Sequence, residues 1–136
     1  MFSHVCVGSA DLDRAARFYD AVLFELGLVQ RTVVPDGGPQ AVCWAAPGQP
    51  LPRFYVYLPL NGQPATAGNG SMVAFLAASP SAVSLAHAAG LAHGGRDEGA
   101  AGPRSRYGDG YFGAYLRDPD GNKLHLAFRG DLELAP

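Results

Sequence analysis

The first half of the chain places short apolar runs around one segment of helical periodicity. Ser9 to Asp11 offer side-chain oxygens of the kind that cap helix N-termini, and apolar residues then recur at intervals of three and four until Gly27. This spacing predicts a helix of about four turns, with the glycine just past its end. The runs rich in β-branched and aromatic residues, which predict strands, cover residues 2–8, 28–34, 40–45 and 53–58.

The second half repeats this order. A Gly- and Pro-rich stretch leads into a new apolar run, after which Ser79 and Pro80 stand at the cap and first position of a second predicted helix. That helix stops at Gly94-Gly95, and the sequence Asp-Pro-Asp-Gly-Asn at 118–122 predicts a turn between the last two strands. The predicted strands of this half are residues 71–77, 96–99, 111–117 and 123–128.

The length and composition fit one domain with an ordinary core. The 136 residues are 48% hydrophobic, which supplies enough apolar material without disulfide or metal cross-links. We therefore expect a single α+β domain over residues 1–136, made of two tandem βαβββ modules. Module 1 covers about 1–58, a linker about 59–70, and module 2 about 71–130.

Charge and cysteine content narrow the partners and the compartment. Ten basic and twelve acidic residues give a net charge of −2, which offers no electrostatic footprint for nucleic acid or an anionic membrane. No apolar stretch is long enough for a membrane span. Cys6 and Cys43 lie in apolar segments, which favours reduced thiols in a cytoplasmic protein, although a disulfide stays open.

Duplicated modules tend to lie about a pseudo-twofold axis, so that corresponding strands face the same space. The offset that relates His4 to Met72 also relates His125 to Tyr57, and small differences in loop length make Tyr55 an equal candidate. These four positions are predicted to point inward. Cys6 shares the face of His4 because strand side chains alternate, so it is either a thiol nucleophile or a small buried apolar residue.

With these modules in place, the sequence resembles the vicinal oxygen chelate superfamily, the group of glyoxalase I, the fosfomycin- and bleomycin-resistance proteins and the extradiol dioxygenases. The resemblance covers nearly the whole chain, and its specificity comes from the order and spacing of several short motifs. They are His4, Asp11-Leu12, Arg14, Phe18-Tyr19, Leu26-Gly27, Gly68-Asn69-Gly70, Met72-Val73-Ala74-Phe75 and Arg117 through Leu124.

The resemblance implies curved mixed sheets around a shared cavity, with a metal ligand on the first and last strand of each module. His4 and His125 stand at the first and fourth of these positions, Met72 at the third, and Tyr55 or Tyr57 at the second. The family usually has His at the third position and Glu at the fourth, and thioether and phenol are weak ligands for most divalent ions. We therefore expect either Zn, Ni, Mn or Fe held by His4, His125 and Tyr55, or no metal.

The resemblance also places a substrate pocket, with His4 and His125 as its catalytic pair. Residues 99–113 form a predicted long loop, which is either a solvated connector or lies at the pocket mouth. His87 and His93 are predicted to be surface residues of the second helix, and Trp44 a core residue. The predicted pocket residues are Cys6, Tyr57, Met72, Arg106, Tyr107 and Tyr111.

Two functions follow from the resemblance. The first is a glyoxalase-like enzyme of the lyase, isomerase or dioxygenase type, with an altered metal site and a small oxygenated substrate. The alternative is a metal-free protein that binds a drug or metabolite, as in the bleomycin-resistance branch. A paralogue with a filled pocket is a weaker third hypothesis. In each case we expect a homodimer that binds neither nucleic acid nor membrane.

Overall fold

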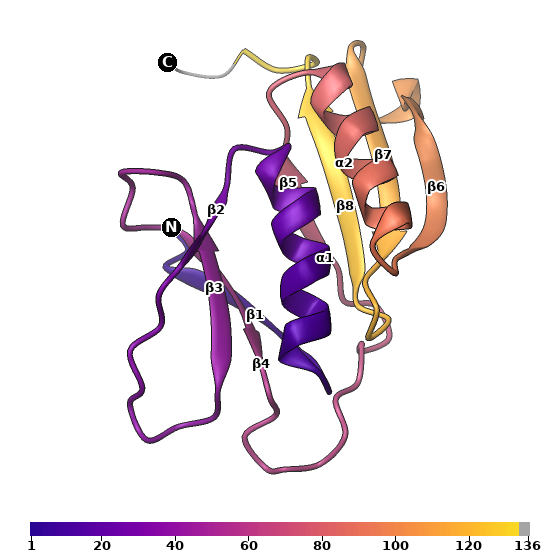
Figure 1. The fold of residues 1–136 in the computed structure, drawn as a ribbon. Coiled ribbons are helices and arrows are strands. Elements are labelled where there is room, and N and C mark those ends of the chain that lie inside the picture. Colours follow the sequence, from indigo (N-terminus) through magenta and orange to yellow (C-terminus); the bar gives the residue numbers. More distant parts are fainter. Residues whose placement is uncertain (134–136) are drawn as a thin grey trace.

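The computed structural model describes residues 1–133 and contains two modules with the same order of elements (Figure 1). Both modules are mixed α and β, which confirms the predicted α+β fold of two tandem units. The first module contains β1 (His4–Gly8), α1 (Leu12–Phe24), β2 (Val29–Arg31), β3 (Ala41–Ala45) and β4 (Arg53–Tyr57). The second contains β5 (Val73–Leu76), α2 (Pro80–Ala92), β6 (Arg96–Pro103), the 3₁₀ turn η1 (Ser105–Tyr107), β7 (Tyr111–Arg117) and β8 (Lys123–Arg129).

Each module forms a four-stranded mixed sheet. The strand orders are β1-β4-β3-β2 and β5-β8-β7-β6, and in both sheets the first strand of the module pairs in parallel with its last. The two helices contact each other and lie on the same side of the sheets (Figure 1). Each sheet therefore packs one face against the helices. No helix within residues 1–133 covers the opposite face, which we call the open face. No helix within residues 1–133 has the length and hydropathy to cross a membrane.

The apolar residues that recur at helical spacing in the first module form the buried face of α1. Asp11 caps this helix by accepting a hydrogen bond from the backbone N–H of Arg14 at 3.0 Å. Past its end, Gly27 takes a φ of +79°, a left-handed conformation in which a side chain would be strained. Phe54 of the first sheet meets Phe75 of the second edge to face at 5.1 Å, so one hydrophobic core runs through both modules.

Residues 99–113 are not the long loop that the sequence predicts. β6 continues to Pro103, and η1 and the start of β7 fill the rest of the segment. Glycine and proline are poor strand formers, yet this stretch pairs with β7 through two shifts in register that accommodate the extra residues. The prediction for His87 is also wrong, because its ring is buried and lies 3.0 Å from the carboxylate of Asp97 on β6. His93 is exposed, and Trp44 is fully buried, both as predicted.

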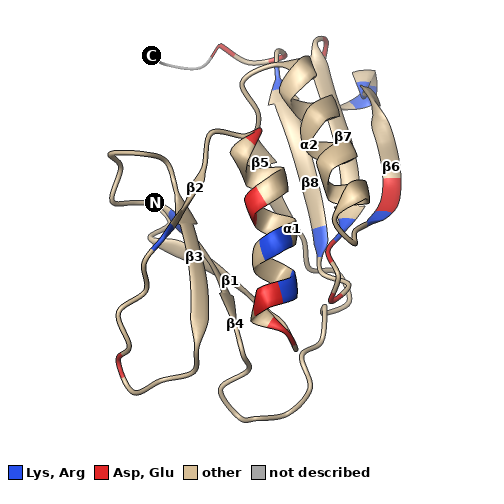
Figure 2. Cartoon of the chain, viewed as in Figure 1, with Lys and Arg blue, Asp and Glu red and all other residues tan. Residues whose placement is uncertain are grey.

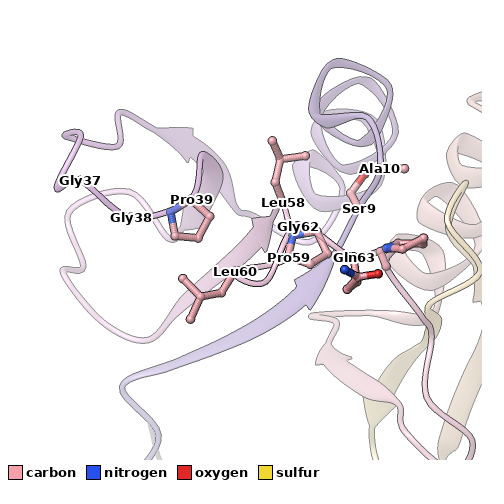
Figure 3. A pocket seen from close by; sticks show the side chains of 12 residues that line it. Ser9, Ala10, Gly37, Gly38, Pro39, Leu58, Pro59, Leu60, Gly62 and Gln63 are labelled. Carbon is pink, nitrogen blue, oxygen red and sulfur yellow. The ribbon is translucent and has the colours of Figure 1, made fainter.

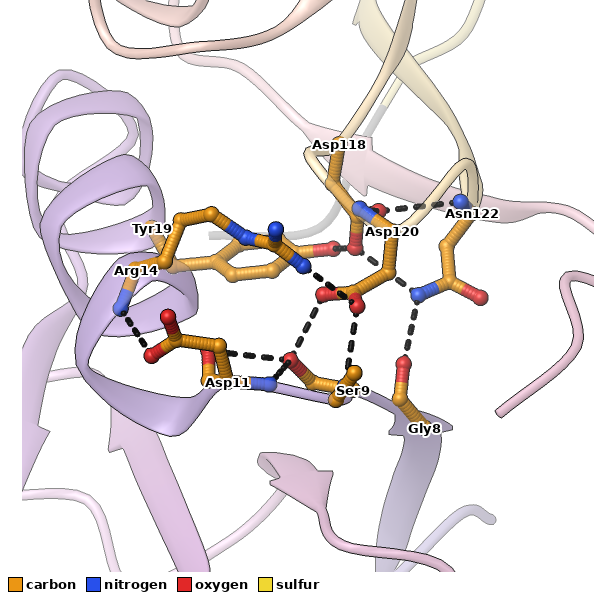
Figure 4. A network of polar contacts seen from close by, with 9 residues as sticks. Gly8, Ser9, Asp11, Arg14, Tyr19, Asp118, Asp120 and Asn122 are labelled. Carbon is orange, nitrogen blue, oxygen red and sulfur yellow. Dashed lines mark hydrogen bonds and ion pairs between the residues drawn. The ribbon is translucent and has the colours of Figure 1, made fainter. Parts of the chain in front are cut away.

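The Asp-Pro-Asp-Gly-Asn turn joins the modules as well as the last two strands (Figure 4). Asp120 accepts a hydrogen bond from the hydroxyl of Ser9 at 2.6 Å and forms an ion pair with Arg14 at 2.8 Å. Asp118 is 2% exposed and accepts from the hydroxyl of Tyr19 at 2.6 Å. A turn of module 2 thus holds β1 and α1 of module 1 through buried, charge-assisted hydrogen bonds.

Candidate functional site

The open face of the first sheet carries the site residues predicted for module 1. Strand alternation and the pairing of Cys6 with Tyr55 place His4, Cys6, Tyr55 and Tyr57 on this face together. The ring of His4 contacts Tyr55 edge-on at 5.6 Å, and the rings of Tyr55 and Tyr57 lie 5.4 Å apart. These side chains therefore form one aromatic surface.

The strand register distinguishes Tyr55 from Tyr57 as the counterpart of His125. Cys6 pairs with Tyr55 in the first sheet, and Ala74, which occupies the place of Cys6 in the second module, pairs with His125. Tyr55 is therefore the pseudo-twofold equivalent of His125. Its hydroxyl accepts a hydrogen bond from Arg53 at 3.3 Å.

The two cysteines lie on either side of Tyr55 and are both free thiols. Two strand spacings separate them by about 10 Å, which is too far for a disulfide. Cys6 is exposed, so the alternative that it is a small buried apolar residue is wrong. Partial desolvation and the neighbouring Cys43 raise the pKa of the Cys6 thiol, which disfavours the thiolate that a nucleophile requires.

His125 lies on the open face of the second sheet and is enclosed by tyrosines. The rings of Tyr115 and Tyr111 stack on it at 4.0 and 5.8 Å. Its Nδ1 lies 2.9 Å from the carbonyl oxygen of Ala114, which only accepts, so Nδ1 carries the proton. Nε2 then accepts the hydroxyl proton of Tyr111 at 2.6 Å. Both ring nitrogens of His125 are occupied by partners within the chain.

This environment predicts a specific pH dependence. Burial, followed by Arg104 and Lys123, lowers the pKa of His125 below its ordinary value. Because the folded protein then binds this proton less readily than the unfolded chain, the free energy of unfolding should fall as the pH drops below about 6.5. Nitrogen-detected NMR titration should show His125 as the neutral Nδ1–H form at pH 6.5. A fully protonated ring at that pH would contradict the assignment.

Beside His125, two phenols and an arginine form a polarised group. Tyr107 accepts a hydrogen bond from the guanidinium of Arg106 at 3.0 Å, and its oxygen lies 3.5 Å from that of Tyr115. The hydrogen bond with Tyr115, followed by that with Arg106, lowers the pKa of Tyr107, whereas the same contact and burial raise the pKa of Tyr115 to about 12. Either hydroxyl can donate in the contact between Tyr107 and Tyr115. When Tyr115 donates, the proton of Tyr107 is available for an acceptor outside the pair.

Four cations surround these rings (Figure 2 shows basic positions around η1 and at both ends of β8). Only Arg129 has a carboxylate partner, Asp131 at 2.8 Å, among the described residues near the rings. Cations over ring faces are weakly stabilising by themselves and leave the surface electropositive. The distances to ring centroids are 4.8 Å for Arg106 over Tyr107, 5.1 Å for Lys123 and 6.0 Å for Arg104 over Tyr115, and 5.0 Å for Arg129 over Tyr111.

Pockets lie beside the linker between the modules. One of about 390 Å³ is lined by both modules and includes Cys6, Met72 and Lys123, the last of which also contacts Tyr115. A pocket of about 700 Å³ has Cys6 and Tyr57 in its wall, and it adjoins another of about 700 Å³ around Pro39 and Leu60 (Figure 3). Of the predicted site residues, Cys6, Tyr57 and Met72 line these pockets, whereas His4, Tyr55, Arg106, Tyr107, Tyr111 and His125 do not. We call the two open faces, with the pockets beside them, the open strip.

The donor set along this strip does not fit a divalent ion. His125 has no free ring nitrogen, the Tyr55 hydroxyl faces a guanidinium, and Met72 offers a thioether. Within residues 1–133, no group of three or more His, Cys, Asp and Glu side chains is arranged to hold a metal ion. A metal held by His4, His125 and Tyr55 would require Tyr111 to release His125 first.

Sequence reasoning missed Tyr115, Lys123 and Gly113 as parts of this surface. Tyr115 follows Tyr111 by four residues on one strand, so period-two alternation alone places both on the same face. Lys123 and His125 are related in the same way on β8. Gly113 lies between the two tyrosines, and glycine inside a strand often marks the close approach of another group.

The family model described as Glyoxalase/Bleomycin resistance protein/Dioxygenase superfamily matches residues 1–126. A glyoxalase/bleomycin resistance protein from Albidiferax ferrireducens T118 is 42% identical, with a TM-score of 0.78 over 95% of this chain and 98% of that one. A glyoxalase-related enzyme from Fulvimarina pelagi is 20% identical, with a TM-score of 0.70 over 100% and 97% of the two chains. A lactoylglutathione lyase from Agrobacterium tumefaciens is 19% identical, with a TM-score of 0.62 over 95% and 93%. No curated protein matches the chain.

Proposed function

Because the chain belongs to the Glyoxalase/Bleomycin resistance protein/Dioxygenase superfamily, we propose that it binds a small oxygen-bearing aromatic anion on its open strip, without a resident metal ion. The observation that carries this proposal is the group of Tyr107, Tyr115 and Arg106. Its electropositive surroundings favour a negative charge, and the Tyr107 hydroxyl can donate to a ligand oxygen. The aromatic surface around it suits a planar ligand.

The proposal favours the binding-protein alternative over a metal-dependent lyase or dioxygenase. Metal chemistry in this fold would act as a Lewis acid on ligand oxygens, whereas here the available electrophiles are the Tyr107 proton and the guanidinium of Arg106. The name of the relative that is 42% identical, a glyoxalase/bleomycin resistance protein, includes both alternatives, so the choice rests on the site itself. Homodimerisation and a cytoplasmic location accompany the proposal as predictions.

The experiment is a calorimetric titration of salicylate into protein whose metal content has been measured by plasma mass spectrometry. We expect binding to metal-free protein, no change with added EDTA, and about tenfold weaker binding in Tyr107→Phe, which loses the hydroxyl that donates to the ligand and accepts from Arg106. Affinity should also fall as the pH rises toward deprotonation of Tyr107, below the range of an ordinary tyrosine, because a phenolate repels the anion.

Controls separate the charge from the ring. Salicylamide, which lacks the negative charge, should bind more weakly than salicylate to the native protein. Its affinity should be the same for Arg106→Gln as for the native protein. Arg17→Gln, an exposed arginine on α1, should leave salicylate binding unchanged. Near-stoichiometric metal that is lost in His4→Ala, together with salicylate binding only to the metal-loaded form, would overturn the metal-free proposal.

A further inference from the structure

A second cavity borders the open strip and shares Val5 and Val73 with the pocket of about 390 Å³. It is a crevice of about 400 Å³ between β1 and β5, and its lining does not include Tyr107, Tyr115, Arg106 or His125. Trp44, Phe54 and Phe75 form its floor, and each belongs to the hydrophobic core shared by the modules. Its volume lies within the range of small-molecule pockets.

The mouth of the crevice is also apolar. A cavity that is closed to solvent has no such exposed apolar rim. Phe2 is 74% exposed and Leu51 is 51% exposed, although both line the cavity. Val5 of β1 lines it as well and is 37% exposed. Large apolar side chains that surround an opening onto core aromatics create a surface that an apolar ligand can cover favourably.

One charge marks the edge of the crevice. Among the described residues that line it, Arg53 is the only Asp, Glu, Lys, Arg or His. Its Nε donates to the carbonyl oxygen of Pro50 at 2.8 Å and its Nη1 to the hydroxyl of Tyr55 at 3.3 Å. These contacts fix the guanidinium at the rim, while its Nη2 makes no hydrogen bond within residues 1–133 and can donate to an acceptor in the opening.

We propose that this crevice binds an amphiphile with a single negative charge, such as a medium-chain carboxylate. The hydrocarbon chain lies against Trp44, Phe54 and Phe75, and the carboxylate accepts from the guanidinium of Arg53. An apolar floor with one cation at the edge is complementary to an amphiphile with one negative charge. It does not suit a dianion, because the second charge would have no partner in the lining. The site takes a different class of ligand from the open strip, which it meets through the hydrogen bond from Arg53 to Tyr55.

Trp44 gives a direct readout because it is the single tryptophan of the sequence. Its indole is held by a hydrogen bond from Nε1 to Asp20 at 2.9 Å, so a ligand in the crevice changes the surroundings of a fixed fluorophore. Titration with sodium octanoate should change its emission in a saturable manner, and calorimetry should give the same affinity. Butanoate, which is too short to cover the floor, should bind at least tenfold more weakly.

Two variants test the geometry. Val5→Phe places a larger side chain into the crevice and should weaken octanoate binding at least tenfold, whereas Val29→Phe, at a similarly exposed strand position outside the crevice, should not. Arg53→Gln should weaken octanoate binding about tenfold and leave 1-octanol binding unchanged. Circular dichroism confirms that each variant is folded before its titration.

The proposal is overturned if octanoate produces neither a fluorescence change nor heat in the native protein. It is equally overturned if Val5→Phe binds octanoate as well as Val29→Phe does. Tyr107→Phe, the variant that tests the open strip, should leave octanoate binding unchanged, so failure at one site is distinguishable from failure at the other.

Discussion

Replacement of Asp118 by alanine should lower the free energy of unfolding by about 3 kcal/mol or more, because it removes the acceptor at the centre of the contact between the modules. The Asp118 carboxylate accepts from the hydroxyl of Tyr19 and from the side-chain amide of Asn122 at 2.6 and 2.9 Å. It also accepts the backbone N–H groups of Asp120 and Asn122, each at 2.9 Å. The alanine would leave these four donors without their partner in a buried place, where an unmade hydrogen bond is costly.

Chemical denaturation followed by far-ultraviolet circular dichroism measures this loss. Asp109→Ala, which changes an exposed aspartate that makes no side-chain hydrogen bond within residues 1–133, is the matched control and should stay within about 0.5 kcal/mol of the native protein. A double-mutant cycle of Tyr19→Phe with Asp118→Asn then isolates the contact between the two modules. An Asp118→Ala protein as stable as Asp109→Ala would show that the turn does not hold the modules together.

The same turn shows what the sequence could predict and what it could not. Its composition identifies a hairpin turn, and that hairpin is present between β7 and β8. Its contacts with Ser9 and Tyr19 depend on how the modules pack, and they join residues about one hundred positions apart. Local patterns carry no information about such contacts, so a structural role for Asp118 required the fold.

Elements with strong periodicity were predictable for a physical reason. The amphipathic stripe of α1 and the left-handed Gly27 are local consequences of sequence, and both are present. β6 was predicted too short because Gly99, Gly102 and Pro103 have low strand propensity. Pairing with β7 outweighs that propensity, which is a tertiary effect.

Alternation along single strands also predicted one face for His4 and Cys6 correctly, but the enclosure of His125 depends on neighbouring strands. Tyr115 lies directly opposite His125 across the β7–β8 hairpin, while Tyr111 reaches it from a position paired with Arg129. Counting outward from the turn would have found the first contact. The second depends on the length of the tyrosine side chain and on space beside Gly113.

The space beside Gly113 makes replacement of this glycine by alanine strongly destabilising. A Cβ atom added at Gly113 would lie 2.6 Å from Cε1 of His125 and 3.2 Å from the carbonyl oxygen of Leu126. Real Cβ atoms do not approach so closely, so in Gly113→Ala the imidazole must leave its position between the tyrosines. We expect the free energy of unfolding to fall by about 2 kcal/mol, as is typical of overpacking, and the hydrogen bond from Tyr111 to be lost.

Gly102→Ala is the matched control, because Gly102 pairs with Gly113 across the β6–β7 ladder and its added Cβ would meet nothing closer than an arginine side-chain nitrogen at 3.4 Å. It should be neutral or stabilise the protein by less than about 1 kcal/mol through reduced entropy of the unfolded chain.

NMR should show the Nδ1–H form of His125 in Gly102→Ala and its loss in Gly113→Ala. Salicylate should bind about tenfold more weakly to Gly113→Ala and with native affinity to Gly102→Ala. The reason is that the displaced imidazole of Gly113→Ala disturbs Tyr115 and, through it, the hydroxyl of Tyr107. Unchanged salicylate binding despite a displaced imidazole would separate His125 from the ligand site and restrict that site to Tyr107, Tyr115 and Arg106.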